Sequence, residues 1–549
     1  MKFEIFDVDV LGRLGLIEVN NKRMVTPNLL PVIHPTSNLI SAAELEKFGA
    51  ECIFTNAFIL YQNTELRREV LNKGIHKSLN FNGLIATDSG AFQQYMYNNK
   101  KFDLDAETIE TFQEEIGSDF PVILDVPVQI NDNYETAKSK VITTINRAKD
   151  NVKRRARNDC YWFGPIHGGY FQDLLEKSII EMSKLDFSVY ALGGLVKLLL
   201  DYRFDFVLKN LLTVKSKSPP NKPIHMFGLG LPQFFSLAVG CGCDLMDSAA
   251  YILFAREERY FTLSTGTKHL DELEEFPCHC PICSDYTPKE LKKCNRDRRI
   301  ELLARHNLYL SFSELKTIRQ SIREGNLWEL IEQRIRIHPN LVKALQIIKE
   351  YNPFIEKYEK LYKNHGRLYS SIESFNRPLI YRYLNRILND YRCPEGIKYL
   401  LILPELDVKG KNSPTFNHWM DFLDENKQVN RKQIHVVFFS LPYGIIPLEL
   451  AETFPMGQYE SITPLDPSSC RNSLKNTEFF LKKYSKEYVK GALLIPKSYI
   501  NQFGEVKEFV ENFLLKELKE LTKSSSGLKI SIFNHIEQVI EFFKKDCLK

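Results

Sequence analysis

The first 250 residues alternate between short apolar runs and stretches with helical spacing. The runs are rich in β-branched and aromatic residues. The stretches between them, such as SAAELEKFG and DAETIETFQEEIG, repeat apolar residues every three or four positions and end near Gly. This alternation predicts parallel β/α units. The expected strands lie in ECIFT (51–55), GLIAT (83–87), PVIL (121–124), YWFGPI (161–166), FSVYAL (187–192), KPIHMF (222–227) and CDLM (243–246).

Polar or glycine residues follow most of these expected strands. A closed barrel brings the carboxyl ends of all its strands round one centre, where barrel enzymes hold their chemistry. An open sheet would concentrate the site at one or two switch points. We therefore expect an α/β fold, a (β/α)8 TIM barrel with these residues on its rim. They are Asp88, Asp125, His167, Gly168, Gly193, Gly194, Gly228 and Asp247.

The pattern changes after the barrel. Residues 298–362 have helical spacing, and a second group of apolar strand-like runs begins near 397. We expect a catalytic barrel over 1–350 that contains a zinc subdomain at about 270–310. A helical connector over 351–395 and a C-terminal α+β accessory domain over 396–549 follow. The tail after Val506 is helical in pattern and rich in Lys.

Composition limits the class of protein but does not indicate a function. Of 549 residues, 44% are hydrophobic and 26% charged, which is typical of a soluble protein. No run of about 18 apolar residues is present, and the acids in MKFEIFDVDV argue against a signal peptide, so we expect a cytoplasmic protein without a membrane span. Residues 291–350 carry 13 Lys and Arg against 7 Asp and Glu. That excess suits a polyanion or a solvated helical face equally well.

Three cysteines within six residues form a distinct group in CHCPIC. Three thiolates and one imidazole match a closed tetrahedral zinc site, which is structural because no coordination position stays open. Cys294 competes with the histidine as fourth ligand, and three unrelated thiols are the alternative reading. We favour a zinc site made of Cys278, Cys280, Cys283 and His306.

The rim carboxylates are the candidate catalytic groups. A single Asp after a strand is equally well explained as a cap of the next helix. Three such residues on one rim favour chemistry, because paired carboxylates can divide the roles of nucleophile and acid/base in glycosidic bond cleavage. The Gly pairs at 168–169 and 193–194 and the aromatic Phe92 would suit a flat ligand, although turns and core packing would give the same residues.

Several motifs together resemble the tRNA-guanine transglycosylases, over roughly residues 1–350. They are DSGAFQ (88–93), LDVP (124–127), ALGGL (191–195), DLMDSAAY (244–251) and the CHCPIC segment through His306. EFPCHCPICSDYTPKEL is most similar to the archaeal type, which inserts the 7-deazaguanine preQ0 at position 15 of the tRNA D-loop, on the way to archaeosine. PYGIIPLELAETFPMGQYES resembles an archaeal accessory domain more weakly.

The resemblance implies roles for individual residues. Asp247 would attack C1′ of the target nucleotide and form a covalent glycosyl-enzyme, and Asp88 would be the acid/base. Asp125 would bind the edge of guanine or preQ0, and Phe92 would stack on it. Further substrate-binding residues would be Ser89, His167, Gly193, Gly194 and Leu195, and one structural Zn²⁺ per subunit would complete the enzyme.

Two departures from the family concern binding. His167 stands where the family usually has Gln, which puts the base preference and its pH dependence in question. Many archaeal members end in a PUA domain that binds tRNA, and we expect none here, or one supplied by a separate chain. The family also implies a homodimer formed through the zinc region.

Three other functions fit the sequence less well. An altered paralog, either a tRNA-binding partner or a later archaeosine enzyme, is disfavoured because Asp88, Asp125 and Asp247 are all present. A retaining glycoside hydrolase would need a Trp-rich rim, and the chain has only three Trp. A zinc-dependent RNA-binding module would not explain the rim carboxylates.

Overall fold

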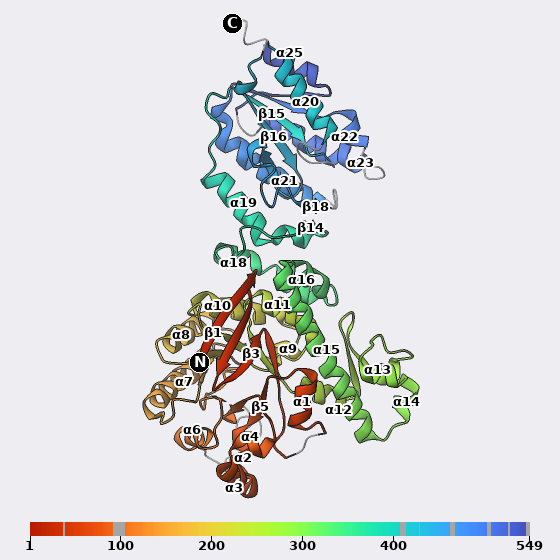
Figure 1. The fold of residues 1–549 in the computed structure, drawn as a ribbon. Helices are drawn as coiled ribbons and strands as arrows, with labels where there is room; N and C mark the ends of the chain where they lie inside the picture. Colours follow the sequence, from red (N-terminus) through yellow and green to blue (C-terminus); the bar gives the residue numbers. More distant parts are fainter. Residues whose placement is uncertain are drawn as a thin grey trace. The chain divides into compact units, whose positions relative to one another are not determined.

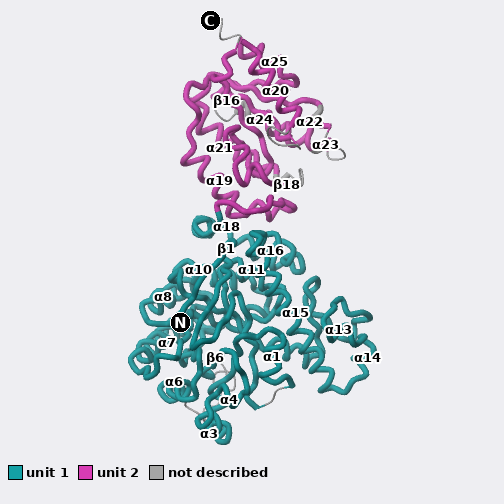
Figure 2. The backbone as a smooth tube through the Cα atoms, in the orientation of Figure 1, with its two compact units in different colours: residues 1–360 teal, residues 361–549 magenta. Residues whose placement is uncertain are grey.

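The protein is described here by a computed structural model that covers residues 1–36, 39–91, 105–406, 413–427, 429–461, 467–501, 507–524 and 527–544. The chain divides into two compact units, Met1–Lys360 and Leu361–Lys549, drawn in different colours in Figure 2. The first unit therefore extends ten residues beyond the expected limit at 350. Residues 361–395, expected as part of a connector, belong to the second unit.

Parallel strands organise the described part of the first unit, whose surrounding helices are labelled in Figure 1. They form a five-stranded sheet with the order β4-β11-β10-β9-β8 and a three-stranded sheet with the order β5-β6-β7. Two isolated parallel bridges, Val32 with Phe54 and Val122 with Phe163, link one sheet to the other. The strands are β4 (Asn28–Pro31), β5 (Cys52–Asn56), β6 (Leu84–Asp88), β7 (Phe120–Pro121), β8 (Phe163–Ile166), β9 (Val189–Leu192), β10 (Ile224–Met226) and β11 (Leu245–Ser248).

Helices separate these strands, which confirms the predicted alternation of parallel strands and helices. Several begin at a capping side chain: Asn133, for example, accepts a hydrogen bond from the backbone N–H of Thr136 at the start of α7. The helices include α1 (Ala42–Phe48), α2 (Ala57–Gln62), α3 (Thr64–Lys73), α4 (Ile75–Leu79), α6 (Ala106–Glu115), α7 (Tyr134–Arg154), α8 (Gln172–Ser183), α9 (Val196–Leu200), α10 (Phe204–Lys217), α11 (Pro232–Gly240) and α12 (Ala250–Arg256).

The sequence pattern missed parts of this sheet system. Strand β4 is short and carries Pro31 within the apolar run LLPVI, and Pro is disfavoured inside a strand. Strand β7 covers only Phe120–Pro121, so most of the expected PVIL strand lies outside it, with Val122 in an isolated bridge to Phe163. An antiparallel sheet of β1 (Lys2–Asp9), β2 (Gly12–Val19) and β3 (Lys22–Thr26) also precedes the β/α units.

Apolar side chains fill the amino ends of the parallel strands. One cluster joins the first residues of several strands, among them Leu84, Phe120 and Phe163, to Ile17 of β2 and Met24 of β3. Full burial of such side chains stabilises the fold by about 1.5–3 kcal/mol each. Because β2 and β3 cover this end, the polar residues at the carboxyl ends are left for a site.

A helical region completes the first unit. The hairpin β12 (Arg259–Thr262) and β13 (Gly266–His269) leads to the short helices α13 (Pro281–Asp285) and α14 (Pro288–Lys293). The long helix α15 (Arg296–Glu324) then packs against α12 and β12. It is followed by α16 (Leu327–Ile335), α17 (Pro339–Leu345) and α18 (Ile348–Ile355).

The second unit is built on a mixed sheet with the order β17-β16-β15-β19-β20. Only the pairing of β16 with β17 is antiparallel in this sheet, and the helices α20, α21 and α24 lie in the connections between its parallel strands. The expected α+β class is therefore corrected to α/β. Its main elements are β14 (Arg367–Tyr369), α19 (Pro378–Asn389), β15 (Tyr399–Pro404), α20 (Pro414–Glu425), β16 (Ile434–Ser440), β17 (Gly444–Pro447), β18 (Tyr459–Ser461), α21 (Pro467–Tyr484), β19 (Lys490–Leu494), α22 (Lys497–Asn501), α24 (Lys516–Ser524), β20 (Ile530–Phe533) and α25 (Ile536–Lys544).

Strand β20 lies within the tail that was expected to be helical. Its four residues lie between two amphipathic helices and pair with β19, a contact that local spacing does not reveal. Among the described residues, no helix is both long and apolar enough to cross a membrane.

Candidate active site and metal centre

The predicted carboxylates lie at the carboxyl ends of three parallel strands. Asp88 is the last residue of β6, Asp247 is the penultimate residue of β11, and Asp125 follows β7. His167 and Gly193 directly follow β8 and β9. Parallel pairing thus places these residues on one edge of the sheet system, although up to 159 positions separate them in the chain.

Asp88 is a half-buried carboxylic acid beside the amide of Asn56. The two residues are register partners on β5 and β6, and Nδ2 of Asn56 donates a hydrogen bond to Oδ2 of Asp88 over 3.0 Å. Burial, followed by the negative charges of Asp125 and Asp247, raises the pKa of Asp88 to about 7. The charges of those two carboxylates act on Asp88, so the three acids share one electrostatic environment.

Asp247 contacts a histidine of the adjacent strand. Nε2 of His225, in β10, lies 2.8 Å from Oδ1 of Asp247, and the backbone N–H of Gly228 donates to the same oxygen over 3.1 Å. His225 is fully buried, whereas the Asp247 side chain is 12% exposed. The Asp247 side chain is therefore partly accessible, while its partner His225 lies in the interior.

Asp125 has a histidine partner of its own. Nε2 of His167 lies 2.5 Å from Oδ2 of Asp125, and both residues are buried. A Cβ on Gly193 would lie 2.3 Å from Cε1 of His167, so only glycine leaves room for the imidazole there. His167, expected to read the base in place of Gln, is thus bound to a neighbouring carboxylate.

The other predicted binding residues occupy different positions around this edge. Ser89 is fully buried, and its hydroxyl has no hydrogen-bond partner in the part of the chain that the structure describes. Gly194 has φ +76°, and a Cβ there would lie 3.0 Å from the carbonyl oxygen of Val128. Leu195 is buried at the start of α9. Phe92 lies outside the described residues.

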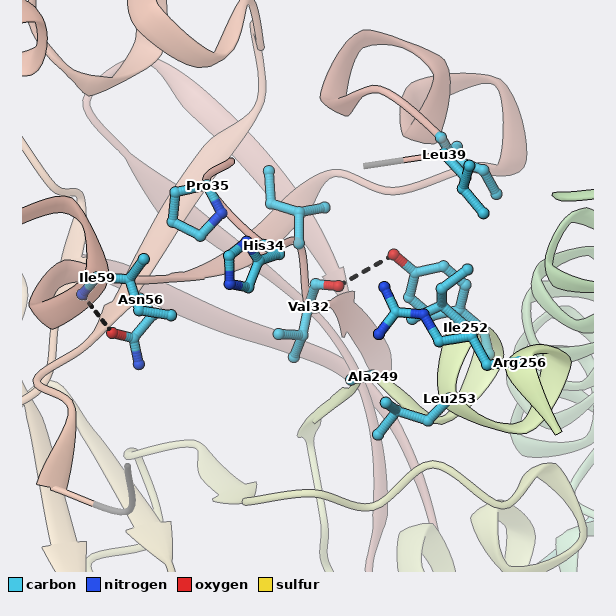
Figure 3. A pocket seen from close by; sticks show the side chains of 13 residues that line it. Val32, His34, Pro35, Leu39, Asn56, Ile59, Ala249, Ile252, Leu253 and Arg256 are labelled. Atoms are coloured by element: carbon cyan, nitrogen blue, oxygen red, sulfur yellow. Dashed lines mark hydrogen bonds between the residues drawn. The ribbon is translucent and has the colours of Figure 1, made fainter. Parts of the chain in front are cut away.

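A pocket of about 170 Å³ is lined by neighbours of Asp88 and Asp247, although not by the acids themselves (Figure 3). Asn56, the partner of Asp88, lines it on one side, and Ala249, two residues after Asp247, lines it on another. His34 and Arg256 supply polar groups to walls that are otherwise largely apolar. The site thus combines paired acids with an adjacent cavity, as ligand sites commonly do.

A cluster of three cysteines and one histidine forms a separate candidate metal site. The ligand atoms of Cys278, Cys280, Cys283 and His306 all lie within 4.8 Å of one another. Nδ1 of His306 faces the thiols, 3.4 Å from Sγ of both Cys280 and Cys283, while Nε2 lies 3.0 Å from the carbonyl oxygen of Phe261. Such an outer hydrogen bond fixes the orientation of a ligating imidazole.

Cys294, the competing candidate for the fourth ligand, is not part of this cluster. Cys294 lies outside it, with Sγ 3.6 Å from the carbonyl oxygen of Glu290. Tyr260 stacks on the ring of His306 with centroids 3.6 Å apart, and its hydroxyl lies 3.3 Å from Sγ of Cys283. The four predicted ligands are thus together, and they could hold a metal ion.

Comparison with known proteins identifies the family. Residues 9–340 match the family model described as queuine tRNA-ribosyltransferase, TGT. The chain belongs to the tRNA-guanine transglycosylase family. Its relatives include proteins named tRNA-guanine(15) transglycosylase from Methanococcus maripaludis, 37% identical over 92% of this chain and 76% of the relative, and from Methanocaldococcus jannaschii, 36% identical over the same shares. One from Methanobrevibacter smithii is 36% identical over 88% and 72%.

The predicted membership of the tRNA-guanine transglycosylase family, and with it the prediction of a transglycosylase enzyme, is confirmed. Sequence reasoning missed His225 and Asn56 as partners of the acids. A signal for His225 was present, because a histidine in the middle of the apolar run KPIHMF needs a buried polar partner. Asn56 ends β5 as Asp88 ends β6, but their pairing depends on strand register.

Proposed function

We propose that this transglycosylase exchanges guanine at position 15 of the tRNA D-loop for 7-cyano-7-deazaguanine, preQ0, in archaeosine synthesis. The observation that carries the proposal is the shared environment of Asp88, Asp125 and Asp247 in a chain whose relatives are named tRNA-guanine(15) transglycosylase. The target nucleotide has to leave its stack, at a cost of a few kcal/mol that contacts with tRNA would offset.

The two catalytic acids take different roles in this proposal. Oxygen of Asp247 forms a bond to C1′ while the C1′–N9 bond breaks, and the electron pair of that bond leaves with guanine. Asp88, whose pKa is about 7, gives a proton to the departing base. Asp88 then takes a proton from the incoming base, whose nitrogen displaces Asp247 from C1′. Covalent capture keeps water from replacing the base.

The remaining rim residues would bind the base. Asp125 accepts from the N–H groups of the guanine-like edge through the oxygen that His167 does not occupy. The backbone of Gly193, Gly194 and Leu195 would complete that contact. Ser89 and Phe92 are proposed substrate-binding residues next to Asp88, with Phe92 stacking on the base.

Two structural features support the proposal of a closed barrel with a structural zinc ion. The parallel bridges that link the ends of the two sheets favour a closed (β/α)8 barrel, which would bring the strand ends round one centre. The donor set of three thiols and one oriented imidazole suits one structural Zn²⁺, which would cross-link the loop before α13 to α15.

Mass spectrometry of tRNA after incubation with preQ0 tests the proposed function. We expect preQ0 to replace guanine at position 15, with release of one guanine per base inserted and no consumption of ATP. A tRNA transcript carrying adenine at position 15 is the control and should remain unmodified. Unchanged wild-type tRNA after this incubation would contradict the proposal.

The pKa of Asp88 gives a prediction about pH. An acid catalyst must be protonated, so we expect kcat/KM to fall as the pH rises through about 7. Asp88→Asn should lose roughly 10²–10⁴-fold in activity and should also lose this basic limb. Initial rates of labelled guanine incorporation across the pH range measure both effects. A basic limb that persists in Asp88→Asn would assign it to another group.

A further inference from the structure

Oδ1 and Oδ2 of Asp247 have different surroundings. Oδ1 accepts hydrogen bonds from Nε2 of His225 at 2.8 Å and from the backbone N–H of Gly228 at 3.1 Å. No described residue donates a hydrogen bond to Oδ2. A carboxylate that is fixed through one oxygen presents the other in a defined direction.

His225 is itself held rigidly. Its ring centroid lies 5.9 Å from that of Phe54, 5.2 Å from Phe163 and 5.0 Å from Phe227. Nδ1 is buried without a hydrogen-bond partner among the described residues. A hydrogen on Nδ1 would lack an acceptor among these apolar rings, so the ring carries its hydrogen on Nε2 and donates it to Asp247.

We propose, on the basis of the proposed function, that His225 is a positioning residue for transglycosylation. Together with Gly228 it immobilises Oδ1 of Asp247, so that Oδ2 is the atom that attacks C1′. The C1′–Oδ2 bond forms as the C1′–N9 bond breaks, and the electron pair and one proton from Asp88 leave with guanine. Oδ1 then becomes the carbonyl oxygen of the glycosyl ester and keeps the same two donors.

The same donors also act in the second half-reaction. There, nitrogen of the incoming base forms a bond to C1′, Asp88 takes its proton, and the C1′–Oδ2 bond breaks. The electron pair returns to the carboxylate of Asp247, and hydrogen bonds from His225 and Gly228 stabilise that negative charge. Loss of His225 should therefore slow both half-reactions.

Two substitutions separate the hydrogen bond from the volume of the side chain. His225→Leu fills the space among the phenylalanines without a donor, and His225→Gln can place an N–H group near the position of Nε2. In steady-state base exchange, we expect His225→Leu to lower kcat about 10- to 100-fold, with the KM for tRNA nearly unchanged. His225→Gln should retain most of the kcat of the wild type.

The outcomes of this experiment distinguish a positioning role of His225 from a packing role. If His225→Leu keeps the kcat of the wild type, the inference fails and the proposed function stands. If both variants lose activity and thermal stability equally, His225 has only a packing role and the inference also fails. His225→Asn, whose amide is too short to reach Asp247, replaces His225→Leu should that variant not fold. A wild-type protein without base exchange would overturn the proposed function and this inference together.

Discussion

Asp247→Asn is expected to abolish base exchange, with kcat lower by about 10⁴-fold or more. The amide is nearly the same size as the carboxylate, and its oxygen can still accept the hydrogen bonds of His225 and Gly228. It cannot supply the nucleophilic oxygen, so no glycosyl-enzyme forms, while tRNA should bind with nearly unchanged affinity. Incorporation of labelled guanine into tRNA measures the loss, and a denaturing gel detects the covalent adduct in the wild type.

Asp150→Asn is the matched control for this prediction. Asp150 lies on α7 with its side chain 56% exposed and forms a surface ion pair with Lys153 over 3.3 Å. Such pairs contribute about 0–1 kcal/mol, so this variant should behave like the wild type. Activity of Asp247→Asn within ten-fold of that control would remove Asp247 from the nucleophile role.

Loss of one thiol from the metal cluster should unfold the segment around α13. No residue of α13 is buried, so the apolar core contributes little to holding this helix in place. Cys280→Ser removes a ligand whose Sγ lies 3.4 Å from Nδ1 of His306. We expect zinc content to fall from about one per chain to a small fraction, and limited proteolysis between α13 and α14 to become at least about ten-fold faster.

Cys294→Ser is the control that distinguishes loss of a metal ligand from the loss of any thiol. Cys294 is eleven residues after Cys283 but lies outside the cluster. This variant should retain zinc and the proteolysis rate of the wild type. Zinc content is measured by elemental analysis of purified protein, and equal zinc loss in both variants would indicate that Cys294 is a ligand after all.

The sequence located the site because its chemistry is marked locally. An Asp directly after an apolar run, as in LIATD, marks the carboxyl end of a strand without knowledge of its neighbours. The spacing of Cys278, Cys280 and Cys283 marks a metal knuckle in the same way, and in the structure the expected His306 completes the cluster. In both cases the informative residues lie within a few positions of one another.

Other features depended on contacts that no local pattern records. The short strand β4 forms because it pairs with β11. Strand β20 forms because it pairs with β19. The α/β class of the second unit was missed for the same reason, since parallel and antiparallel strands can share one apolar pattern.

By itself, the sequence determined that acidic, histidine and glycine residues lie at the carboxyl ends of the parallel strands. The tertiary structure alone decided their partners: His225 for Asp247, His167 for Asp125 and Asn56 for Asp88. The physical reason is that polar residues after apolar runs and close ligand spacing are properties of neighbouring positions in the chain. Hydrogen bonds between side chains of adjacent strands depend on strand order and register. So does the raised pKa of Asp88, because burial and the charges of Asp125 and Asp247 cause it.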